Sequence, residues 1–371
     1  MVARVRGDRL AKRLDRFAGI PVVFTLGLLR RRLHKAPAPA PAARRIGLLK
    51  TSAVGDTVLL SGPAADLRQH FPDAEIVLFV GSSNREAAAL IASADRVVEL
   101  EVERPHHAIR EIRRHPVDLL LDFGPWPRIN AVLSYCARAR WRAGFRTPGQ
   151  YRHYVYDLVA DHEGNRHEIE NYRQLLREMG VPAGHAPSLS LGQPVERTPR
   201  ILVHMFSGGS RASLKEWPEE RWVEAVDRLL RETGRDVVLT GGAADRGRAE
   251  RVRARLSHDQ RVVNAAGELG LAATARLVAS CSLVVTVDTG ILHLASAVGA
   301  DLIALHGPTE PRRWGALNPN SVSIIHRQPC APCLSLGFES RCGKPLCMQA
   351  IEVDEVVAAA RCFLERLTPE P

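Results

Sequence analysis

The chain has 371 residues, 45% of them hydrophobic, which is longer than one hydrophobic core usually serves. This composition excludes a largely disordered protein and predicts two domains of ordinary size. The net charge of +10 would suit a nucleic-acid-binding protein, but residues 1–35 alone hold ten Lys or Arg against two acidic residues. The rest of the chain is nearly neutral, so we predict no nucleic-acid partner.

The first predicted element is the basic tail, residues 1–35. Its 13-residue uncharged run, from Phe17 to Leu29, is too short to span a bilayer, which takes about 20 apolar residues. The arginines that follow this run argue against an exported signal peptide. We predict a partly helical segment, broken or kinked at Pro21, that lies on an anionic membrane surface. The alternative is an amphipathic helix packed on the protein itself.

Two series of alternating strands and helices follow the tail and an Ala/Pro linker that ends at residue 43. We expect the first series in residues 44–185, with strands in the apolar runs IGLLK, EIVLFVG, RVVELEV, DLLLDF and WRAGF and a helix over residues 57–70. We expect the second series in residues 186–352, with strands in RILVHMF, DVVLTGG, RVVNAAG, SLVVTVD, DLIALHG and SVSIIHR. A stretch rich in Pro, Gly and Ser separates them. The alternation predicts an α/β protein with two Rossmann-like domains, each with a mostly parallel sheet, that face a central cleft. We expect the last helix, within residues 353–371, to cross back to the first domain.

The first domain begins with an apolar strand that runs into the turn of KTSAVGD, residues 50–56. This strand-to-helix turn is where phosphates usually bind in α/β proteins, yet it has one glycine and an acid, Asp56. The positive end of the following helix would keep the Asp56 carboxylate ionised, as a general base requires. Helix capping by Asp56 is compatible with that role.

The strongest motif of the second domain is VDTGILHLASAVG, residues 287–299. Asp288 and Thr289 follow a buried strand, and Gly290 opens a helix that contains His293. Free N–H groups in the first helical turn suit a diphosphate, and Thr289 adds a hydroxyl donor. The alternative is that Asp288 or Thr289 only caps the helix and that His293 is an ordinary core histidine.

A loop of small residues precedes this motif in the chain. Ser207, Gly209 and Ser210 could present N–H and hydroxyl donors to a ligand, and Lys215 follows just before a helix. A lysine there would supply the charge that a departing diphosphate needs. A solvated surface lysine is the alternative.

A third turn, after the next predicted strand, contains Gly241 and Gly242 with Asp245 behind them. The carboxylate of Asp245 could accept hydrogen bonds from the ribose of a nucleotide. Gly-Gly followed by an acid is also common in ordinary turns, so the pattern indicates a nucleoside contact only weakly.

Four of the seven cysteines lie close together near the end of the second domain: Cys330, Cys333, Cys342 and Cys347. Two pairs of thiolates at this spacing could hold a structural zinc ion. Reduced thiols that pack a loop are the other interpretation. Disulfides are not expected in a cytosolic chain.

Together, KTSAVGD, the small-residue loop followed by KEWP, VDTGILHLASAVG, HGPTEP and the closing cysteines resemble a known family. It is the ADP-heptose:lipopolysaccharide heptosyltransferase family, glycosyltransferase family 9, and the resemblance covers residues 44 to about 365. It implies a GT-B fold and inverting transfer that requires no cofactor. It also implies a nucleotide-sugar donor on the C-terminal domain and a lipid-linked acceptor approached from the N-terminal domain.

The resemblance also implies roles for single residues. Asp56 matches the catalytic acid of the family and Lys215 its diphosphate-binding lysine, while the segment from Asp288 to His293 matches the donor-binding signature. The chain differs from the family at His306, where an aromatic residue is usual before Gly-Pro-Thr.

We therefore predict an enzyme that moves a heptose or related sugar from an ADP-sugar to a lipopolysaccharide core or similar glycolipid. The expected location is cytoplasmic, peripheral on the inner membrane. Two alternatives remain open: a non-catalytic, membrane-associated assembly protein that binds a nucleotide sugar, and a nucleotide-sugar epimerase. A pure binder would need no base such as Asp56, and an epimerase would have no obvious use for the tail.

Overall fold

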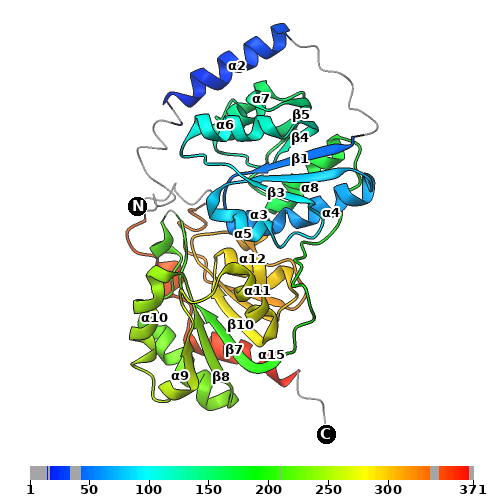
Figure 1. Ribbon diagram of the computed structural model, residues 1–371. Helices are drawn as coiled ribbons and strands as arrows, with labels where there is room; N and C mark the ends of the chain where they lie inside the picture. Colours follow the sequence, from blue (N-terminus) through cyan, green and yellow to red (C-terminus); the bar gives the residue numbers. More distant parts are fainter. Residues whose placement is uncertain (1–14, 16, 34–42, 210, 335–341, 367–371) are drawn as a thin grey trace. The chain divides into compact units, whose positions relative to one another are not determined.

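The chain folds into two compact units, residues 1–190 and 191–371. The computed structural model describes residues 15, 17–33, 43–209, 211–334 and 342–366 (Figure 1). Each unit is a parallel sheet with helices, as the alternating pattern predicts. The expectation that the two units face one cleft stays a prediction. The proposed domain boundary after residue 185 also stays a prediction.

The first unit contains a six-stranded parallel sheet with the order β3-β2-β1-β4-β5-β6. Five of its strands match the predicted apolar runs. The edge strand β6 was not predicted, because four residues are too few to show a period. The strands are β1 (Arg45–Lys50), β2 (Glu75–Val80), β3 (Arg96–Glu99), β4 (Val117–Asp122), β5 (Ala139–Arg146) and β6 (Leu158–Asp161).

Helices and short 3₁₀ turns connect these strands. The helix predicted over residues 57–70 is two helices that meet at Leu60. The elements are α3 (Val54–Leu59), α4 (Ser61–His70), η1 (Ser82–Asn84), α5 (Arg85–Ala88), α6 (Pro105–Arg114), α7 (Arg128–Cys136), η2 (Arg152–Val155) and α8 (Glu168–Glu178).

Helix α2 (Gly19–Leu33), within the basic tail, packs on α7 and η2 of the first unit (Figure 1). Val23 is fully buried against Val155 and Tyr156, and the guanidinium of Arg30 pairs with Asp157 at 2.5 Å. Pro21 lies in the first turn of α2, where proline is tolerated, so the predicted break there is wrong. This face of the helix corresponds to the packed alternative.

The other side of α2 is exposed and apolar. Phe17, Val22, Phe24, Leu28 and Leu29 are between 43% and 75% exposed. Among the described residues, no helix combines the length and the apolar character needed to cross a bilayer. Membrane binding through the tail therefore stays a prediction, and residues 1–14 and 34–42 lie outside the described part.

The second unit repeats the architecture with the strand order β12-β11-β10-β7-β8-β9. All six strands coincide with the predicted apolar runs. They are β7 (Thr198–His204), β8 (Asp236–Thr240), β9 (Val262–Asn264), β10 (Cys281–Val287), β11 (Leu302–His306) and β12 (Ser321–Ile325).

The last helix belongs to the second unit. Val356 and Phe363 of α15 are buried in the same core as Trp222 and Val226 of α9, so the prediction that this helix crosses back to the first domain is wrong. The connecting elements are η3 (Ala212–Leu214), α9 (Glu219–Thr233), η4 (Ala243–Asp245), α10 (Arg246–Arg253), η5 (Asp259–Arg261), α11 (Leu271–Ser280), α12 (Gly290–Ala297), α13 (Pro311–Trp314), α14 (Leu346–Gln349) and α15 (Val353–Glu365).

Both sheets have the same topology. In each, the strand order reverses at one point, between β1 and β4 in the first unit and between β7 and β10 in the second. Open α/β sheets bind ligands outside the carboxyl ends of the strands at such a point. The loops that contain the predicted site residues follow these strands.

Candidate functional site

In the first unit, the carboxylate of Asp56 lies beside a buried lysine. Asp56 is in the first turn of α3, and its side chain is 23% exposed. The Nζ of Lys50, the last residue of β1, lies 2.9 Å from Asp56 Oδ2 and donates to the carbonyl oxygen of Phe123 at 3.1 Å. Because α3 has only six residues, the opposite charge beside Asp56 comes from Lys50 rather than from a long helix.

The sequence pattern did not identify Lys50 as a site residue, because Lys50 stands at the end of a predicted apolar strand. A lysine that closes an otherwise apolar, buried strand was the available signal. Its side chain is only 4% exposed, and buried lysines are uncommon unless they are paired.

The turn that contains Asp56 is fixed by the buried side chain of Asn84. The Asn84 amide donates to the carbonyl oxygen of Lys50 and to the hydroxyl of Thr57, both at 2.7 Å. The Thr57 hydroxyl in turn donates to the carbonyl oxygen of Ala53, whose φ of +76° is unusual for a residue with a side chain. Strained backbone of this kind concentrates at functional sites.

A fully buried ion pair lies at the same carboxyl edge of the first sheet. Arg152 of η2 binds the carboxylate of Asp122, at the end of β4. The other oxygen of Asp122 accepts from the Asn130 amide at 3.2 Å, and Asn130 accepts from the Thr51 hydroxyl at 2.7 Å. These contacts connect the end of β4 to the turn after β1.

In the second unit, Asp288 and Lys215 lie together at the carboxyl edge. Lys215 Nζ is 3.9 Å from Asp288 Oδ2, and both side chains are largely buried. Burial by itself raises the pKa of the Asp288 carboxyl, but its interactions with Lys215 and with the imidazoles of His306 and His293 keep it below its usual value. The surface-lysine alternative for Lys215 is therefore wrong, since it lies beside the predicted diphosphate site.

The loop after β10 has the predicted geometry of a helix start. The Thr289 hydroxyl accepts from the backbone N–H of Ile291 at 3.1 Å, so Thr289 caps α12, and Gly290 is the first helical residue. His293, one turn into the helix, is buried and contributes to the electrostatics of Asp288. Capping by Thr289 leaves its role in donor binding untested.

The small-residue loop after β7 lies next to this helix start. The Ser207 hydroxyl donates to the backbone oxygen of Asp288 at 3.3 Å, which joins the two loops at the point where the strand order reverses. Gly209 has a φ of +86°, a value that glycine adopts without strain. Ser210 lies outside the described residues.

Gly241, Gly242 and Asp245 form a tight turn after β8. Asp245 Oδ2 accepts from the backbone N–H of Gly242 at 3.0 Å. A Cβ at Gly241 would come within 2.9 Å of the Asp245 side chain, so the turn needs a glycine there. Asp245 thus closes the turn, and its contact with a ribose stays a prediction.

Two buried histidines at this edge were not predicted as site residues. His204 ends β7, and its Nδ1 lies 3.0 Å from the Thr240 hydroxyl. Burial lowers the pKa of the His204 imidazole to about 4. His306 ends β11 and is fully buried. Both follow apolar strand residues, where a buried polar side chain is the signal to look for.

The four clustered cysteines are free thiols. Burial raises the pKa of the Cys347 thiol, and Cys333 and Cys330 raise it further. The Cys342 thiol donates instead to the carbonyl oxygen of Lys344 at 3.0 Å. Within the described residues, no set of three His, Cys, Asp or Glu side chains is arranged to bind a metal, and residues 335–341 lie outside that part.

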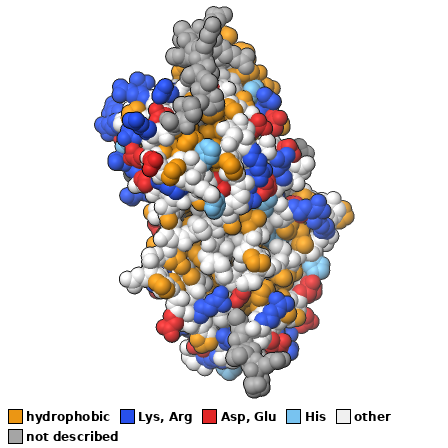
Figure 2. Space-filling model, turned by 90° about the vertical axis from the view of Figure 1, so that its right-hand side faces the viewer, with side chains coloured by type: hydrophobic (Ala, Val, Ile, Leu, Met, Phe, Trp, Pro, Cys, Tyr) orange, Lys and Arg blue, Asp and Glu red, His pale blue; other side chains and the backbone are white. Residues whose placement is uncertain are grey.

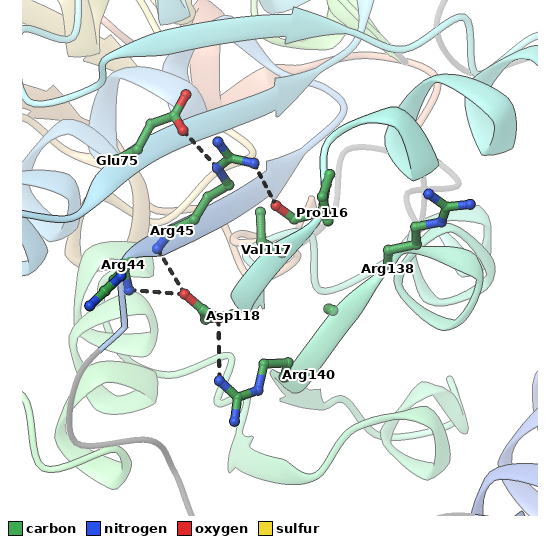
Figure 3. Close-up of a pocket in the computed structure, with 9 residues that line it drawn as sticks. Arg44, Arg45, Glu75, Pro116, Val117, Asp118, Arg138 and Arg140 are labelled. Atoms are coloured by element: carbon green, nitrogen blue, oxygen red, sulfur yellow. Dashed lines mark hydrogen bonds and ion pairs between the residues drawn. The ribbon is translucent and has the colours of Figure 1, made fainter.

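A pocket of about 580 Å³ lies at the opposite, amino edge of the first sheet (Figure 3). Arginines before and within β1 and β5 line it, and Asp118 accepts from the backbone N–H groups of Arg44 and Arg45 at 2.9 and 3.0 Å. Figure 2 shows acidic and basic side chains interspersed over much of one face, with one compact basic group at its upper left. The pocket is not the candidate site, because ligands of α/β sheets bind at the carboxyl edge.

Comparison with known proteins gives consistent results. A family model described as glycosyltransferase family 9 (heptosyltransferase) matches residues 107–341, well over half of the chain. Lipopolysaccharide heptosyltransferase 1 of Pseudomonas aeruginosa is 27% identical over 368 residues, which cover 88% of this chain and 99% of the relative.

Two solved structures share the fold. Heptosyltransferase II of E. coli has a TM-score of 0.70 at 22% identity and covers 87% of this chain and 99% of its own. The E. coli heptosyltransferase WaaC with ADP has a TM-score of 0.69 at 20% identity, with 87% of this chain and all of that chain covered. The predicted GT-B architecture is thereby confirmed. The chain is an enzyme of glycosyltransferase family 9, the heptosyltransferases.

Proposed function

We propose that this glycosyltransferase moves a heptose or related sugar from an ADP-sugar donor to a lipopolysaccharide core or similar lipid-linked acceptor. The pairing of Asp56 with buried Lys50 carries the proposal, since it fixes a carboxylate at the edge of the sheet where ligands bind. A sugar-binding protein without catalytic activity would need no such base.

The donor's diphosphate would bind at the second unit. Lys215 and the N–H groups at the start of α12 supply positive charge there. ADP is the proposed nucleotide because the structural relative WaaC of E. coli is described with ADP. Within the described residues, Lys215 Nζ is paired with Asp288 at 3.9 Å, which is longer than a hydrogen bond, so it could turn towards phosphate oxygens.

The reaction would be a single displacement. An acceptor hydroxyl attacks the anomeric carbon as its proton passes to Asp56, and the bond from that carbon to the diphosphate oxygen breaks on the opposite face. The anomeric configuration is therefore inverted. Lys215 and the α12 N–H groups would stabilise the charge that develops on the leaving ADP, which is the task of a divalent metal in other enzymes.

We also propose that the protein works at the cytoplasmic surface of the inner membrane. The exposed apolar side of α2, with Phe24 and Leu28, would insert at the lipid interface, next to a basic sequence that favours anionic lipids. A lipid-linked acceptor would then be reached without extraction from the membrane.

The cysteine cluster is proposed to hold a structural zinc ion, apart from the reaction. Cys330, Cys333 and Cys347 are close enough to influence one another. The fourth ligand would require Cys342 to leave its contact with the Lys344 carbonyl oxygen. Metal analysis of the purified protein checks this assignment.

Two substitutions test the proposed reaction. Asp56→Asn should lower transfer from ADP-heptose to a lipid A core acceptor by about 10² to 10⁴, the usual contribution of a general base, with donor affinity unchanged. Lys215→Ala should weaken ADP-heptose binding. Asp73→Asn, at an exposed carboxylate of the same unit, is the control.

Each result has a contrary outcome. Transfer by Asp56→Asn at the wild-type rate would remove Asp56 as the base. Unchanged donor affinity in Lys215→Ala would remove the diphosphate contact. Isomerisation of ADP-heptose without any acceptor would replace transfer with epimerisation.

A further inference from the structure

His306 is a buried imidazole without a hydrogen-bonding partner at the edge that holds Asp288. Its ring is fully buried, and neither Nδ1 nor Nε2 hydrogen-bonds any group in the described part of the chain. A buried polar group left unpaired destabilises a fold. A neutral, apolar side chain would fill the position without that cost.

The strand register places His306 beside Asp288. Val287, the last residue of β10, pairs with Leu305 of β11; Asp288 directly follows β10, and His306 is the last residue of β11. In a parallel pair, such residues point to the same face of the sheet. Asp288 therefore has Lys215 and the imidazole of His306 as neighbours, and His293 of α12 also acts on it.

Only Lys215 is charged in the ligand-free site. Burial lowers the pKa of the His306 imidazole, and the charge of Lys215 lowers it further, against the opposite effect of Asp288 and Glu310. The Cys347 thiol of α14 lies beside Gly307 and makes no hydrogen bond to the His306 ring. His306 is therefore neutral near pH 7 while Lys215 faces Asp288.

Binding of a diphosphate changes this balance. It adds negative charge at the start of α12 and draws Lys215 towards the phosphate oxygens. Asp288, which is 7% exposed, then needs a new cationic partner, since a buried unpaired carboxylate is costly.

We propose that His306 takes up one proton from solvent when the donor diphosphate binds, and replaces Lys215 as the ionic partner of Asp288. His306 acts here as a positioning residue: it frees Lys215 for the leaving group and touches no reacting atom. This inference rests on the proposed donor site in the second unit. It makes donor affinity fall as pH rises, by up to about tenfold per pH unit for one linked proton.

Calorimetry measures the proton directly. ADP-heptose is titrated into the full-length protein at pH 7 in phosphate and in Tris, buffers with different heats of ionisation. Both phosphates of this donor are esterified, so the ligand itself does not titrate near neutral pH. The wild-type protein should take up close to one proton for each donor bound.

Three variants isolate His306. His306→Phe should bind donor with no proton uptake and with an affinity independent of pH between 6.5 and 8. It should also unfold no lower than wild type, because it removes an unpaired polar group. His306→Asn provides the same test if the Phe variant fails to fold. His258→Phe, an exposed histidine of the same unit, should behave as wild type.

Two outcomes overturn the inference. One is donor binding by the wild-type protein without proton uptake, and the other is the same uptake in the His306 variants. Neither outcome would contradict the proposed donor binding or the proposed transfer. Absence of ADP-heptose binding by every protein would instead contradict the proposed function.

Discussion

Lys50 and Asp56, the proposed base, form a close ion pair in the first unit. Lys50→Met would leave the Asp56 carboxylate without its partner at 2.9 Å. A hydrogen bond to a charged group contributes about 1.5–3 kcal/mol, so kcat should fall roughly 10- to 100-fold. Steady-state kinetics and donor titration should show this loss with donor affinity unchanged.

The control for that variant is Lys344→Met, at an exposed lysine of the second unit. It should keep full activity. A wild-type kcat in Lys50→Met would mean that the contact with Lys50 does not matter for the base.

His204 predicts how stability responds to acid. Its folded-state pKa of about 4 lies below the usual value near 6.5 of an unfolded chain. The unfolded chain therefore binds the proton first, and folding stability falls as pH drops from about 6.5 to about 4, by up to about 3 kcal/mol. His204→Asn should lack this part of the acid sensitivity in urea unfolding at pH 7 and pH 4.5.

His258→Asn, at an exposed histidine, should lose stability in acid as wild type does. Equal acid sensitivity in wild type and His204→Asn would contradict the assigned role of His204.

At the residue scale, the sequence identified the loops of the candidate site but not the residues that lie beside them in space. Asp56, Lys215 and Asp288 were identified from local motifs, and the structure places all three at carboxyl edges. Lys50 and His306 were missed, because an isolated polar residue at the end of an apolar strand gains meaning only when its neighbours in space are known.

At the scale of elements, helix α2 has two apolar faces with different roles. Leu28→Ser combined with Leu29→Ser should reduce binding to anionic vesicles, because both side chains are exposed, and should leave the melting temperature unchanged. Val23→Ser should lower the melting temperature, because Val23 is fully buried. Vesicle sedimentation and thermal unfolding measure the two effects.

Val263→Ser, at an exposed apolar residue of the second unit, is the matched control and should bind vesicles as wild type does. Full vesicle binding by the double variant would place the membrane contact elsewhere. Removing residues 1–35 altogether is a poorer test, since it would uncover Val155 and leave Asp157 without Arg30.

Strands were predictable from the sequence where their apolar pattern extended over enough residues. Eleven of the twelve strands coincide with apolar runs, and the exception, β6, has four residues and no period to read. The packing of α15 was not predictable, because a helix with one apolar face can cover either unit. The apolar side chains of α15 pack in one core with Trp222 and Val226 of α9, so α15 covers the second unit.

At the scale of the whole molecule, the proposed reaction uses the chain's own charges in place of a metal. Transfer from ADP-heptose should therefore persist in EDTA, as measured by ADP release in the presence of acceptor. Activity that disappears in EDTA and returns with Mg²⁺ would contradict the metal-independent mechanism. Zinc added back separates this result from a loss of fold at the cysteine cluster.

The sequence by itself determined the family, the two α/β units and the loops that carry Asp56, Lys215 and Asp288, because these depend on local patterns and on residues close in the chain. Only the tertiary structure decided which residues meet. The carboxyl ends of adjacent parallel strands bring together groups far apart in sequence, such as Asp288 and His306. Burial then decides which of those groups stay neutral and which carry charge.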